Sequence, residues 1–337
     1  MQNSFWQGQR VLVTGATGLV GSWLTKELLA NGAKVTALTR DLSPQSELVL
    51  SGQYKQVQII RGGLESYETV ERAISQSECS SIIHLAAQAI VSTARRSPLL
   101  TFESNIRGTY HILEAARIHR DYVKAVVFAS SDKAYGTAPN LPYFEDMPLA
   151  GEQPYEVSKS CGDLICQSYY KSYSTPVAVA RCGNIYGGGD LNFSRIIPGT
   201  IRSLLLGERP QIRSDGTFVR DYIYVKDTVQ AYLSLAQAVY EGRCLGEAFN
   251  FSPERPVSVL ELVKLIQEKM SAQNLKPLIE DKACGEIHSQ YLDSAKATKL
   301  LKWKPKFSLE EGLDETIDWY REFLSYTGEL AKTAVPR

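Results

Sequence analysis

The chain of 337 residues carries 37 basic and 37 acidic side chains, so its formal net charge is zero and nothing indicates a nucleic acid partner. Hydrophobic residues make up 44% and charged residues 22%, which is ordinary for a globular protein. No apolar stretch reaches the roughly 20 residues of a membrane span, and the N-terminus lacks a basic segment followed by an apolar one. We therefore expect a cytoplasmic protein without membrane contact, built as one α/β unit with an appended lobe.

The cysteines indicate a reducing compartment, and we expect no metal site. None of the six has C-x-x-C spacing, and several lie inside apolar runs, which favours reduced, buried thiols. They are Cys79, Cys161, Cys166, Cys182, Cys244 and Cys284.

Short apolar runs alternate with helical stretches through the first half of the chain. Strands that are apolar on both faces and separated by helices indicate a parallel sheet, and right-handed connections make it a doubly wound, Rossmann-type α/β fold. The expected strands are residues 10–14, 34–38, 57–60, 81–85, 125–129 and 177–180, and the clearest helices are 22–31, 101–119 and 156–173.

The second half of the chain is less regular. It contains three consecutive glycines at 187–189 and several prolines, with helical spacing at 257–270 and 309–323. We interpret residues 1–180 as a dinucleotide-binding domain and residues 181–330 as a smaller C-terminal lobe that binds the substrate, with some segments returning to the first domain. Ligands bind at the carboxyl edge of such a sheet, and we expect the lobe to close over it.

A glycine-rich turn follows the first strand and precedes the first helix. Its G-x-x-G-x-x-G spacing is typical of a dinucleotide site, because the glycines allow a tight turn, close approach of a diphosphate and packing of the helix on the strand. The helix N-terminus would then face the phosphates with free N–H groups. The cofactor contacts expected from this turn are Gly15, Thr17, Gly18, Leu19, Val20 and Gly21.

The end of the second strand bears on the choice between NAD and NADP. Thr39 stands where an acidic residue would bind the ribose 2′-hydroxyl of NAD, and Arg40 after it can pair with a 2′-phosphate or stack on adenine. Arg40 therefore favours NADP slightly, whereas Asp41 keeps NAD open.

Two short segments indicate the chemistry. Tyr155 and Lys159 form a Tyr-x-x-x-Lys pair that can take a proton from an alcohol while a nicotinamide takes the hydride. Ser131 lies upstream at the usual interval, and Asp132 and Lys133 follow it at the end of an apolar run. This acid and this amine exceed what redox chemistry requires, so the surplus indicates elimination of water coupled to oxidation and reduction.

These segments together resemble the extended short-chain dehydrogenase/reductase superfamily. The resemblance rests on the glycine turn, His84 to Gln88, Asn105-x-x-Gly108-Thr109, Ser130 to Gly136, Tyr155 to Lys159, Arg181-x-x-Asn184-x-Tyr186-Gly187 and Val219 to Tyr222. Sugar 4-epimerases usually have small residues where Asp132 and Lys133 stand, and thymidine-diphosphate-glucose dehydratases usually have Asp-Glu. The Asp132-Lys133 pair resembles that of nucleotide-sugar 4,6-dehydratases outside the thymidine-diphosphate-glucose group. Segments 5–10, 21–24 and 182–190 make the chain most similar to the CDP-glucose group.

The resemblance implies a dehydratase of deoxysugar and polysaccharide biosynthesis that converts CDP-glucose to CDP-4-keto-6-deoxyglucose and regenerates its NAD or NADP in each cycle. Tyr155 would take the proton of the sugar 4-hydroxyl, with Ser131 bound to the same oxygen. Lys159 would lower the pKa of the Tyr155 phenol and hold the ribose. Lys133 would remove the C5 proton, and Asp132 would protonate the departing 6-hydroxyl.

The resemblance also implies further ligand contacts. Arginine can bind a diphosphate bidentately, and Arg220 is the strongest expected ligand. The sequence is equally consistent with Arg195 as a ligand and with Arg195 as an ordinary surface charge. Tyr291 follows Gln290 at a place where related enzymes often have an Arg-Tyr pair. The expected set adds Leu64, Leu85, Ala86, Ala87 and Asn105 on the cofactor, and Gln88, Ser131, Asn184, Arg195, Arg220 and Tyr291 on the nucleotide-sugar substrate.

Two other functions stay open from the sequence. A nucleotide-sugar 4-epimerase would use Tyr155 without elimination, and a regulatory protein that binds the cofactor would not need the complete set of Ser131, Tyr155 and Lys159. A UDP- or GDP-sugar is the alternative substrate of a dehydratase.

The expected oligomer is a homodimer. Helices 101–119 and 156–173 carry apolar residues on more than one face, such as Ile106 and Leu164. One face packs on the sheet and the other needs cover. Related enzymes pair these helices around a two-fold axis, which implies a four-helix interface.

Overall fold

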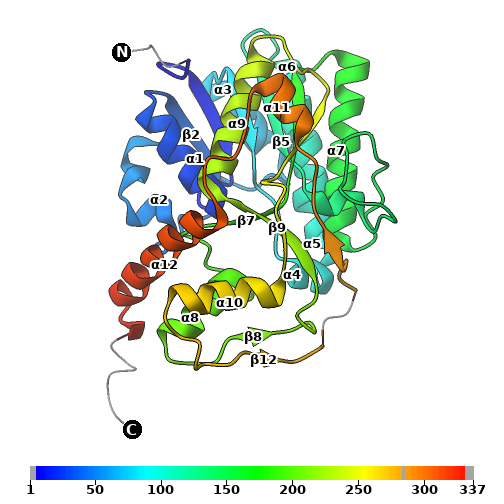
Figure 1. The fold of residues 1–337 in the computed structure, drawn as a ribbon. Helices are drawn as coiled ribbons and strands as arrows, with labels where there is room; N and C mark the ends of the chain where they lie inside the picture. The colour runs from blue at the N-terminus through cyan, green and yellow to red at the C-terminus, as the bar shows by residue number, and fades with distance from the viewer. Residues whose placement is uncertain (1–4, 283–284, 331–337) are drawn as a thin grey trace.

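Seven parallel strands form the central sheet of the computed structural model, which describes residues 5–282 and 285–330 (Figure 1). Their order is β10-β6-β5-β4-β1-β2-β3, so the strand order reverses between β1 and β4. Ligands of such sheets bind at the carboxyl ends of the strands beside this reversal. The strands are β1 (Arg10–Thr14), β2 (Lys34–Thr39), β3 (Gln58–Arg61), β4 (Ser81–His84), β5 (Ala125–Ala129), β6 (Val177–Cys182) and β10 (Ala248–Phe251).

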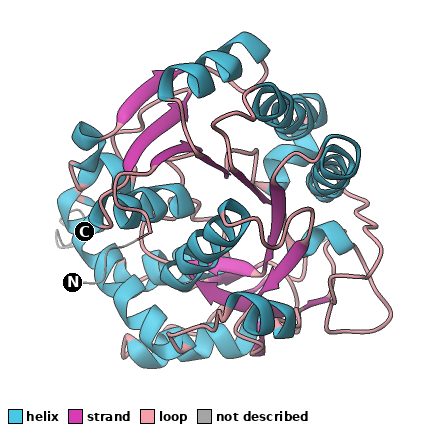
Figure 2. Cartoon of the chain, turned by 90° about the horizontal axis from the view of Figure 1, so that it is seen from above, coloured by secondary structure: helices cyan, strands magenta, loops and turns pink. Residues whose placement is uncertain are grey.

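Neighbouring strand residues belong to different cores on the two faces of the sheet. Val11 and Val13 contribute to one core, and Leu12 between them contributes to the other. Figure 2 shows helices on both sides of the strands, so the doubly wound, Rossmann-type α/β fold is confirmed. One core is closed by α1 (Leu19–Ala30) and α9 (Val225–Tyr240), and the other by α3 (Tyr67–Ser77), α6 (Gly108–Ile118) and α7 (Pro154–Tyr173).

The helix predicted at 101–119 begins earlier and is not regular throughout. It starts as α5 (Pro98–Phe102), widens into a π-helical turn at Glu103–Arg107 and continues as α6. Asn105 in this turn is buried and bonds to Gln88 and Ser158. The wider turn therefore directs a polar side chain inward, as such turns often do near functional sites.

The smaller lobe predicted after residue 180 has a core of its own and lies beside the large sheet (Figure 1). Tyr222 and Tyr224 pack there with Ile197, Leu262 and Leu313 from three helices. The elements of the lobe are β7 (Asn184–Tyr186), α8 (Ile196–Leu205), β8 (Gln211–Ile212), β9 (Val219–Tyr224), β11 (Pro256–Ser258), α10 (Val259–Lys269), β12 (Leu278–Ile279), β13 (Ser289–Gln290) and α12 (Leu309–Tyr326).

Three segments after residue 180 lie in or against the large sheet. Strand β10 pairs with β6 at the sheet edge, and α9 packs on β5 and β6. Helix α11 (Ala295–Leu301) adds Ala297 to the core under α9. The division into residues 1–180 and 181–330 stays a prediction, and the chain passes between the two parts more than once.

Short elements complete the described chain. They are the helices α2 (Glu47–Leu50) and α4 (Val91–Arg96) and two 3₁₀ turns at Gln53–Gln56 and Asp132–Tyr135. Within residues 5–282 and 285–330, no helix combines the length and the apolar character needed to cross a membrane. Cys79, Cys166 and Cys182 are buried free thiols, whereas Cys284 lies outside the described residues.

Candidate active site

A cavity of about 1570 Å³ lies between the carboxyl ends of the central strands and the small lobe. Its large-domain wall comes from the β1–α1 turn, the loop after β4, the end of β5 and the start of α7, and its lobe wall comes from α8, β9 and nearby loops. The predicted residues that line it are Gly15, Thr17, Gly18, Leu19, Val20, Gly21, Arg40, Leu64, Leu85, Ala86, Ala87, Ser131, Asp132, Lys133, Tyr155, Lys159, Asn184, Arg195 and Arg220.

The glycine turn has the geometry that a diphosphate needs. Gly15 has a φ of +74°, and a Cβ there would lie 2.8 Å from the backbone nitrogen of Ala86. A Cβ on Gly21 would lie 2.0 Å from the carbonyl oxygen of Gly15. Gly18 is the N-cap of α1 without a side-chain cap, and the first turn of α1 has no acidic residue. The N-terminus of α1 therefore offers its N–H groups to an anion in the cavity, which fits a nicotinamide dinucleotide.

The end of β2 forms another part of the same wall. The hydroxyl of Thr39 donates a hydrogen bond to the carbonyl oxygen of Asp41 at 2.8 Å. Arg40 and Asp41 are both exposed and line the cavity. A cation and a carboxylate therefore lie side by side where the adenosine ribose of a dinucleotide would bind.

A 3₁₀ turn directly after β5 carries the first catalytic candidates. The hydroxyl of Ser131 donates to Oδ1 of Asp132 at 2.9 Å and accepts from the backbone nitrogen of Lys133 at 3.2 Å. Asp132 is 2% exposed, and its Oδ2 has no hydrogen-bond partner among the described residues. A buried, unpartnered carboxylate oxygen beside a cavity is costly unless a ligand engages it, which indicates a functional position.

Lys133 follows Asp132 and extends to the small lobe. Its Nζ donates to Oε1 of Gln290 at 2.9 Å. Burial lowers the pKa of Lys133, while the carboxylate of Asp132 acts in the opposite direction. An amine with a lowered pKa provides the neutral form that a general base requires.

Tyr155 and Lys159 are placed by the first turns of α7. This helix begins with Pro154 and a capping box between Gln153 and Glu156. Nζ of Lys159 donates to the carbonyl oxygen of Ala129 at 2.6 Å and lies 5.8 Å from the centre of the Tyr155 ring. Both side chains line the cavity.

The predicted effect of Lys159 on the pKa of Tyr155 stays a prediction, and burial acts against it. Burial raises the pKa of Tyr155 to about 12, although the guanidinium of Arg195 and the hydroxyl of Ser131 act in the opposite direction. Burial also lowers the pKa of Lys159 to about 8. Burial of the phenol therefore outweighs the opposing effects of Arg195 and Ser131.

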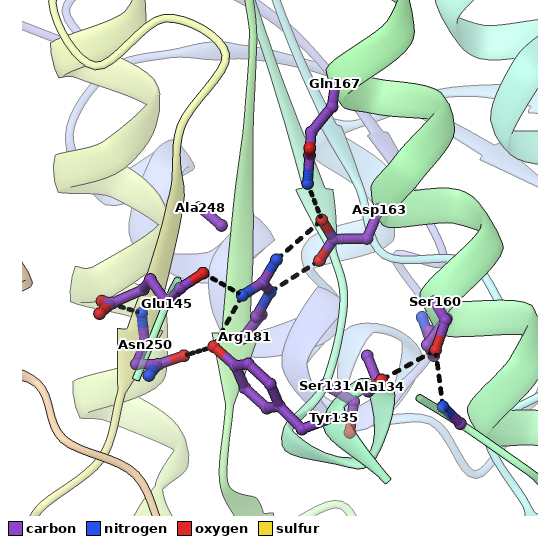
Figure 3. A network of polar contacts seen from close by, with 12 residues as sticks. Ser131, Ala134, Tyr135, Glu145, Ser160, Asp163, Gln167, Arg181, Ala248 and Asn250 are labelled. Atoms are coloured by element: carbon purple, nitrogen blue, oxygen red, sulfur yellow. Dashed lines mark hydrogen bonds and ion pairs between the residues drawn. The ribbon is translucent and has the colours of Figure 1, made fainter. Parts of the chain in front are cut away.

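A buried polar network fixes the 3₁₀ turn at Asp132–Tyr135 to α7 (Figure 3). The guanidinium of Arg181 donates two hydrogen bonds to Asp163 at 2.7 and 3.0 Å and one to the hydroxyl of Tyr135 at 2.7 Å. Tyr135 in turn donates to Asn250 on β10, and Ser160 of α7 donates to the carbonyl oxygen of Ala134. The turn that carries Asp132 and Lys133 is thus bonded to the helix that carries Tyr155 and Lys159.

The predicted substrate ligands on the lobe are held in different ways. Arg195 is exposed and pairs with Asp190 at 3.1 Å. Arg220 is buried and donates to the carbonyl oxygens of Val219, Ile287 and His288. Nδ2 of Asn184 is buried without a hydrogen-bond partner among the described residues.

Three predicted residues do not line the cavity. Asn105 accepts from the backbone of Gln88 at 2.7 Å and donates to Ser158 at 2.9 Å, so it ties the loop after β4 to α7. Tyr291 accepts a hydrogen bond from Tyr143 through its backbone. The ligand contacts of Gln88, Asn105 and Tyr291 stay predictions.

A family model described as GDP-mannose 4,6 dehydratase matches residues 12–316, which is most of the chain. The chain belongs to this family. A CDP-glucose 4,6-dehydratase from Salmonella typhimurium is 30% identical over 96% of this chain and 94% of its own length. The predicted membership of the nucleotide-sugar dehydratase and epimerase group is therefore confirmed.

Solved structures similar to this GDP-mannose 4,6-dehydratase family member include both reaction types. A UDP-glucose 4-epimerase from Thermotoga maritima, solved with UDP-glucose, has a TM-score of 0.84 and 29% identity over 93% of this chain and 99% of its own. A dTDP-glucose 4,6-dehydratase from Bacillus anthracis, solved in complex with NAD, has a TM-score of 0.84 and 26% identity over 96% of this chain and 100% of its own.

Sequence reasoning did not single out several charged residues of the cavity wall of this family member. Arg95 and Arg96 line it from α4, and Arg202 and Arg213 line it from the lobe. Isolated arginines in helices and loops look like ordinary surface charges in a sequence, so no local signal distinguishes them. Sequence reasoning also missed the contact between Lys133 and Gln290. It had noted only that Gln290 stands where related enzymes often have an arginine.

Proposed function

We propose that the chain is a nucleotide-sugar 4,6-dehydratase that converts CDP-glucose to CDP-4-keto-6-deoxyglucose. The observation that carries this proposal is the pair formed by Asp132 and Lys133 in the cavity wall, next to Ser131 and Tyr155. A 4-epimerase needs the serine and the tyrosine but has no use for this additional acid and amine. The full-length similarity to a CDP-glucose 4,6-dehydratase supports the choice of nucleotide.

In the proposed reaction, the β1–α1 turn and Lys159 would hold a nicotinamide dinucleotide, which would supply temporary storage of the hydride between its removal from C4 of the sugar and its delivery to C6. Tyr155 takes the proton of the 4-hydroxyl, and Ser131 holds the same oxygen. The 4-ketone acidifies the C5–H bond, so Nζ of Lys133 takes that proton and the bonding electrons form the C5–C6 double bond. The C6–O bond breaks, and Asp132 gives its proton to the leaving hydroxyl.

The proton balance of this sequence closes. Lys133 becomes an ammonium group on taking the C5 proton and returns that proton to C5. The proton that leaves O4 replaces the one that Asp132 gives up. The net change is therefore the loss of one water from the sugar.

The lobe supplies the groups for the nucleotide diphosphate in this proposal. Arg195 and Arg220 are the cations that we assign to it, with the unpartnered Nδ2 of Asn184 as a further donor. Charge-assisted bonds from arginine to phosphate oxygens are strong and directional. Arg220 would exchange part of its backbone partners for the ligand.

The dinucleotide is NAD or NADP in this proposal. The exposed guanidinium of Arg40 supports NADP, whereas Asp41 beside it suits NAD. The NAD complex of the Bacillus anthracis relative also favours NAD.

The test is incubation of the purified protein with NAD⁺ or NADP⁺ and the CDP-, UDP-, GDP- and dTDP-glucose substrates in parallel. We expect loss of one water by mass spectrometry, with the ultraviolet absorbance of a 4-keto-6-deoxy sugar in alkali, and the highest rate with the CDP sugar. Another sugar nucleotide as the best substrate would correct the nucleotide assignment.

A 4-epimerase is the second candidate, and the similarity to the Thermotoga maritima UDP-glucose 4-epimerase favours it. It would give a product of unchanged mass that differs only in the configuration at C4. That outcome, without any water loss, would replace the dehydratase proposal.

We further propose a homodimer through α5, α6 and α7. These helices expose large apolar side chains, including Leu99 at 69%, Leu100 at 68% and Leu164 at 54%. Large apolar side chains that are this exposed on neighbouring helices are unfavourable in water and are typical of an interface. Sedimentation velocity at micromolar concentration should give a dimer, and Leu99→Glu with Leu164→Glu should give a monomer. A wild-type monomer would contradict the proposal.

A further inference from the structure

The side chain of Lys133 is bound by a residue of the small lobe that lies outside the cavity lining. Its Nζ donates to Oε1 of Gln290 at 2.9 Å, although the two residues are 157 positions apart. Lys133 lines the cavity, whereas Gln290 lies outside its lining and is 0% exposed. Its amide oxygen therefore meets the amine of Lys133 from the side away from the cavity.

The backbone of Gln290 is fixed by the small lobe. Strand β13 pairs in parallel with β9, where Gln290 lies opposite Arg220. The side chain is buried, and its Nε2 has no hydrogen-bond partner among the described residues. The amide is therefore held by its paired backbone, by the packing around it and by the hydrogen bond that its oxygen accepts from Lys133.

The direction of this hydrogen bond matters for a base. A neutral amine has two N–H donors and one lone pair. The amide oxygen of Gln290 engages one N–H and leaves the lone pair of Nζ free. Because Gln290 approaches from outside the cavity lining, the rest of the amine faces the cavity that Lys133 lines.

The charges around Lys133 come from four elements. Asp132 lies on its own turn, Glu156 on α7 and Glu286 before β13, and these three carboxylates favour the ammonium form. Arg220 on β9 opposes it, and burial opposes it most strongly. An additional carboxylate in direct contact with Nζ would add to the three that already favour the ammonium.

We propose that Gln290 is a positioning residue for Lys133: its uncharged amide oxygen orients the amine toward the substrate without adding the negative charge that would keep it protonated. The catalytic meaning of this contact rests on the proposed dehydratase function. The contact itself can be tested without any substrate.

The first experiment measures the titration of Lys133 directly. Wild type, Gln290→Glu and Gln290→Met are labelled with trace acetic anhydride across a pH series, and mass spectrometry gives the labelled fraction of the Lys133 peptide. Gln290→Glu should move the midpoint of Lys133 labelling up by about 1 to 3 pH units, because it places a carboxylate on the amine. Gln290→Met should not raise it.

The matched control is Gln273→Glu, which makes the same charge change at an exposed position after α10. It should leave the labelling midpoint of Lys133 where it is in wild type. A Gln290→Glu midpoint equal to that of wild type and of this control would overturn the proposal.

The second experiment measures water loss from CDP-glucose as a function of pH. In Gln290→Glu the acidic limb of kcat should move to higher pH by the same amount as the labelling midpoint, and the rate should recover in alkali. In Gln290→Met kcat should fall about 10- to 100-fold at every pH with little change in KM, because the amine is no longer held.

These results separate the two proposals. If wild type dehydrates no sugar nucleotide, the proposed function fails, while the labelling experiment still decides the contact. If wild type dehydrates and Gln290→Met keeps full kcat with a normal melting temperature, Gln290 is not a positioning residue. If Gln290→Glu does not fold, the kcat of Gln290→Met still tests the proposal.

Discussion

The large-domain wall and the lobe wall of the cavity hold their polar groups in different ways. On the large-domain side, Ser131 and Asp132 are buried and bonded to each other, and the Arg181 network fixes their turn from behind. On the lobe side, Arg195 is exposed and held by one ion pair, whereas Arg220 is buried and donates to three backbone carbonyl oxygens. The contrast between the Ser131–Asp132 turn and Arg195 indicates that buried polar groups of the cavity fix reacting atoms and that exposed ones adapt to a ligand. Variants of the buried turn and its support should therefore lower kcat or stability, and variants of the exposed residues should change ligand affinity and pH dependence.

The largest effect is expected from the reacting residues themselves. Tyr155→Phe should block C4 oxidation and leave the cofactor oxidised, whereas Lys133→Ala should still allow oxidation and let reduced cofactor accumulate. Losing one positioned acid or base costs on the order of 10²–10⁴ in rate. Single-turnover absorbance of the reduced nicotinamide with CDP-glucose measures both. Normal turnover by Lys133→Ala, or an oxidised cofactor in both variants, would show that Lys133 is not the elimination base.

The next effect tests whether the large-domain wall depends on its buried support. Asp163→Asn leaves the guanidinium of Arg181 without its carboxylate partner, and both side chains are almost fully buried. Breaking such a pair costs about 3–5 kcal/mol in the free energy of unfolding. Asp318→Asn, which breaks the exposed pair with Arg321, should cost less than about 1 kcal/mol. Urea denaturation measures the free energy of unfolding of both variants. Equal losses would show that the buried pair supports the large-domain wall no more than an exposed pair would.

A smaller effect should appear where the two walls meet. The guanidinium of Arg195 lowers the pKa of Tyr155 against the larger effect of burial. Arg195→Gln should therefore raise the pKa of Tyr155 further, so the acidic limb of the pH–rate profile moves to higher pH. It should also raise KM for the sugar nucleotide by about tenfold, because one charge-assisted bond is lost. A pH profile identical to that of wild type would place Arg195 out of electrostatic reach of the base.

The smallest effect is expected at the rim of the cofactor site. Arg40 is exposed, so its interaction with a 2′-phosphate is weakened by solvent and salt. Arg40→Ala should weaken NADP binding by only a few-fold to about tenfold at low salt and leave NAD binding unchanged. Fluorescence titration with both reduced cofactors measures the ratio. An equal loss for both would indicate that Arg40 stacks on the adenine instead.

The sequence predicted those parts of the molecule in which neighbouring residues decide the structure. The glycine turn and the strands from β1 to β6 were read from local spacing and apolar runs, and they lie where expected. Strand β10 was missed because its four residues include Asn250, whose side chain is satisfied only by Tyr135 and Tyr143 in the folded protein. The bond from Lys133 to Gln290 was missed because it joins segments brought together by β13 and β9. The burial that raises the pKa of Tyr155 was not anticipated, because burial cannot be read from the spacing of residues.

The interleaved path of the chain limits how enzymes of this architecture can be recombined. The lobe is assembled from three stretches, one from β7 to β9, one from β11 to β13 and one at α12, while α9, β10 and α11 between them belong to the large sheet. A substrate lobe therefore cannot be transplanted between relatives as one continuous cassette. A chimaera would need several simultaneous junctions, each preserving the edge pairing of β10 with β6. Changing specificity is more practicable by point substitution in the cavity wall than by exchange of modules.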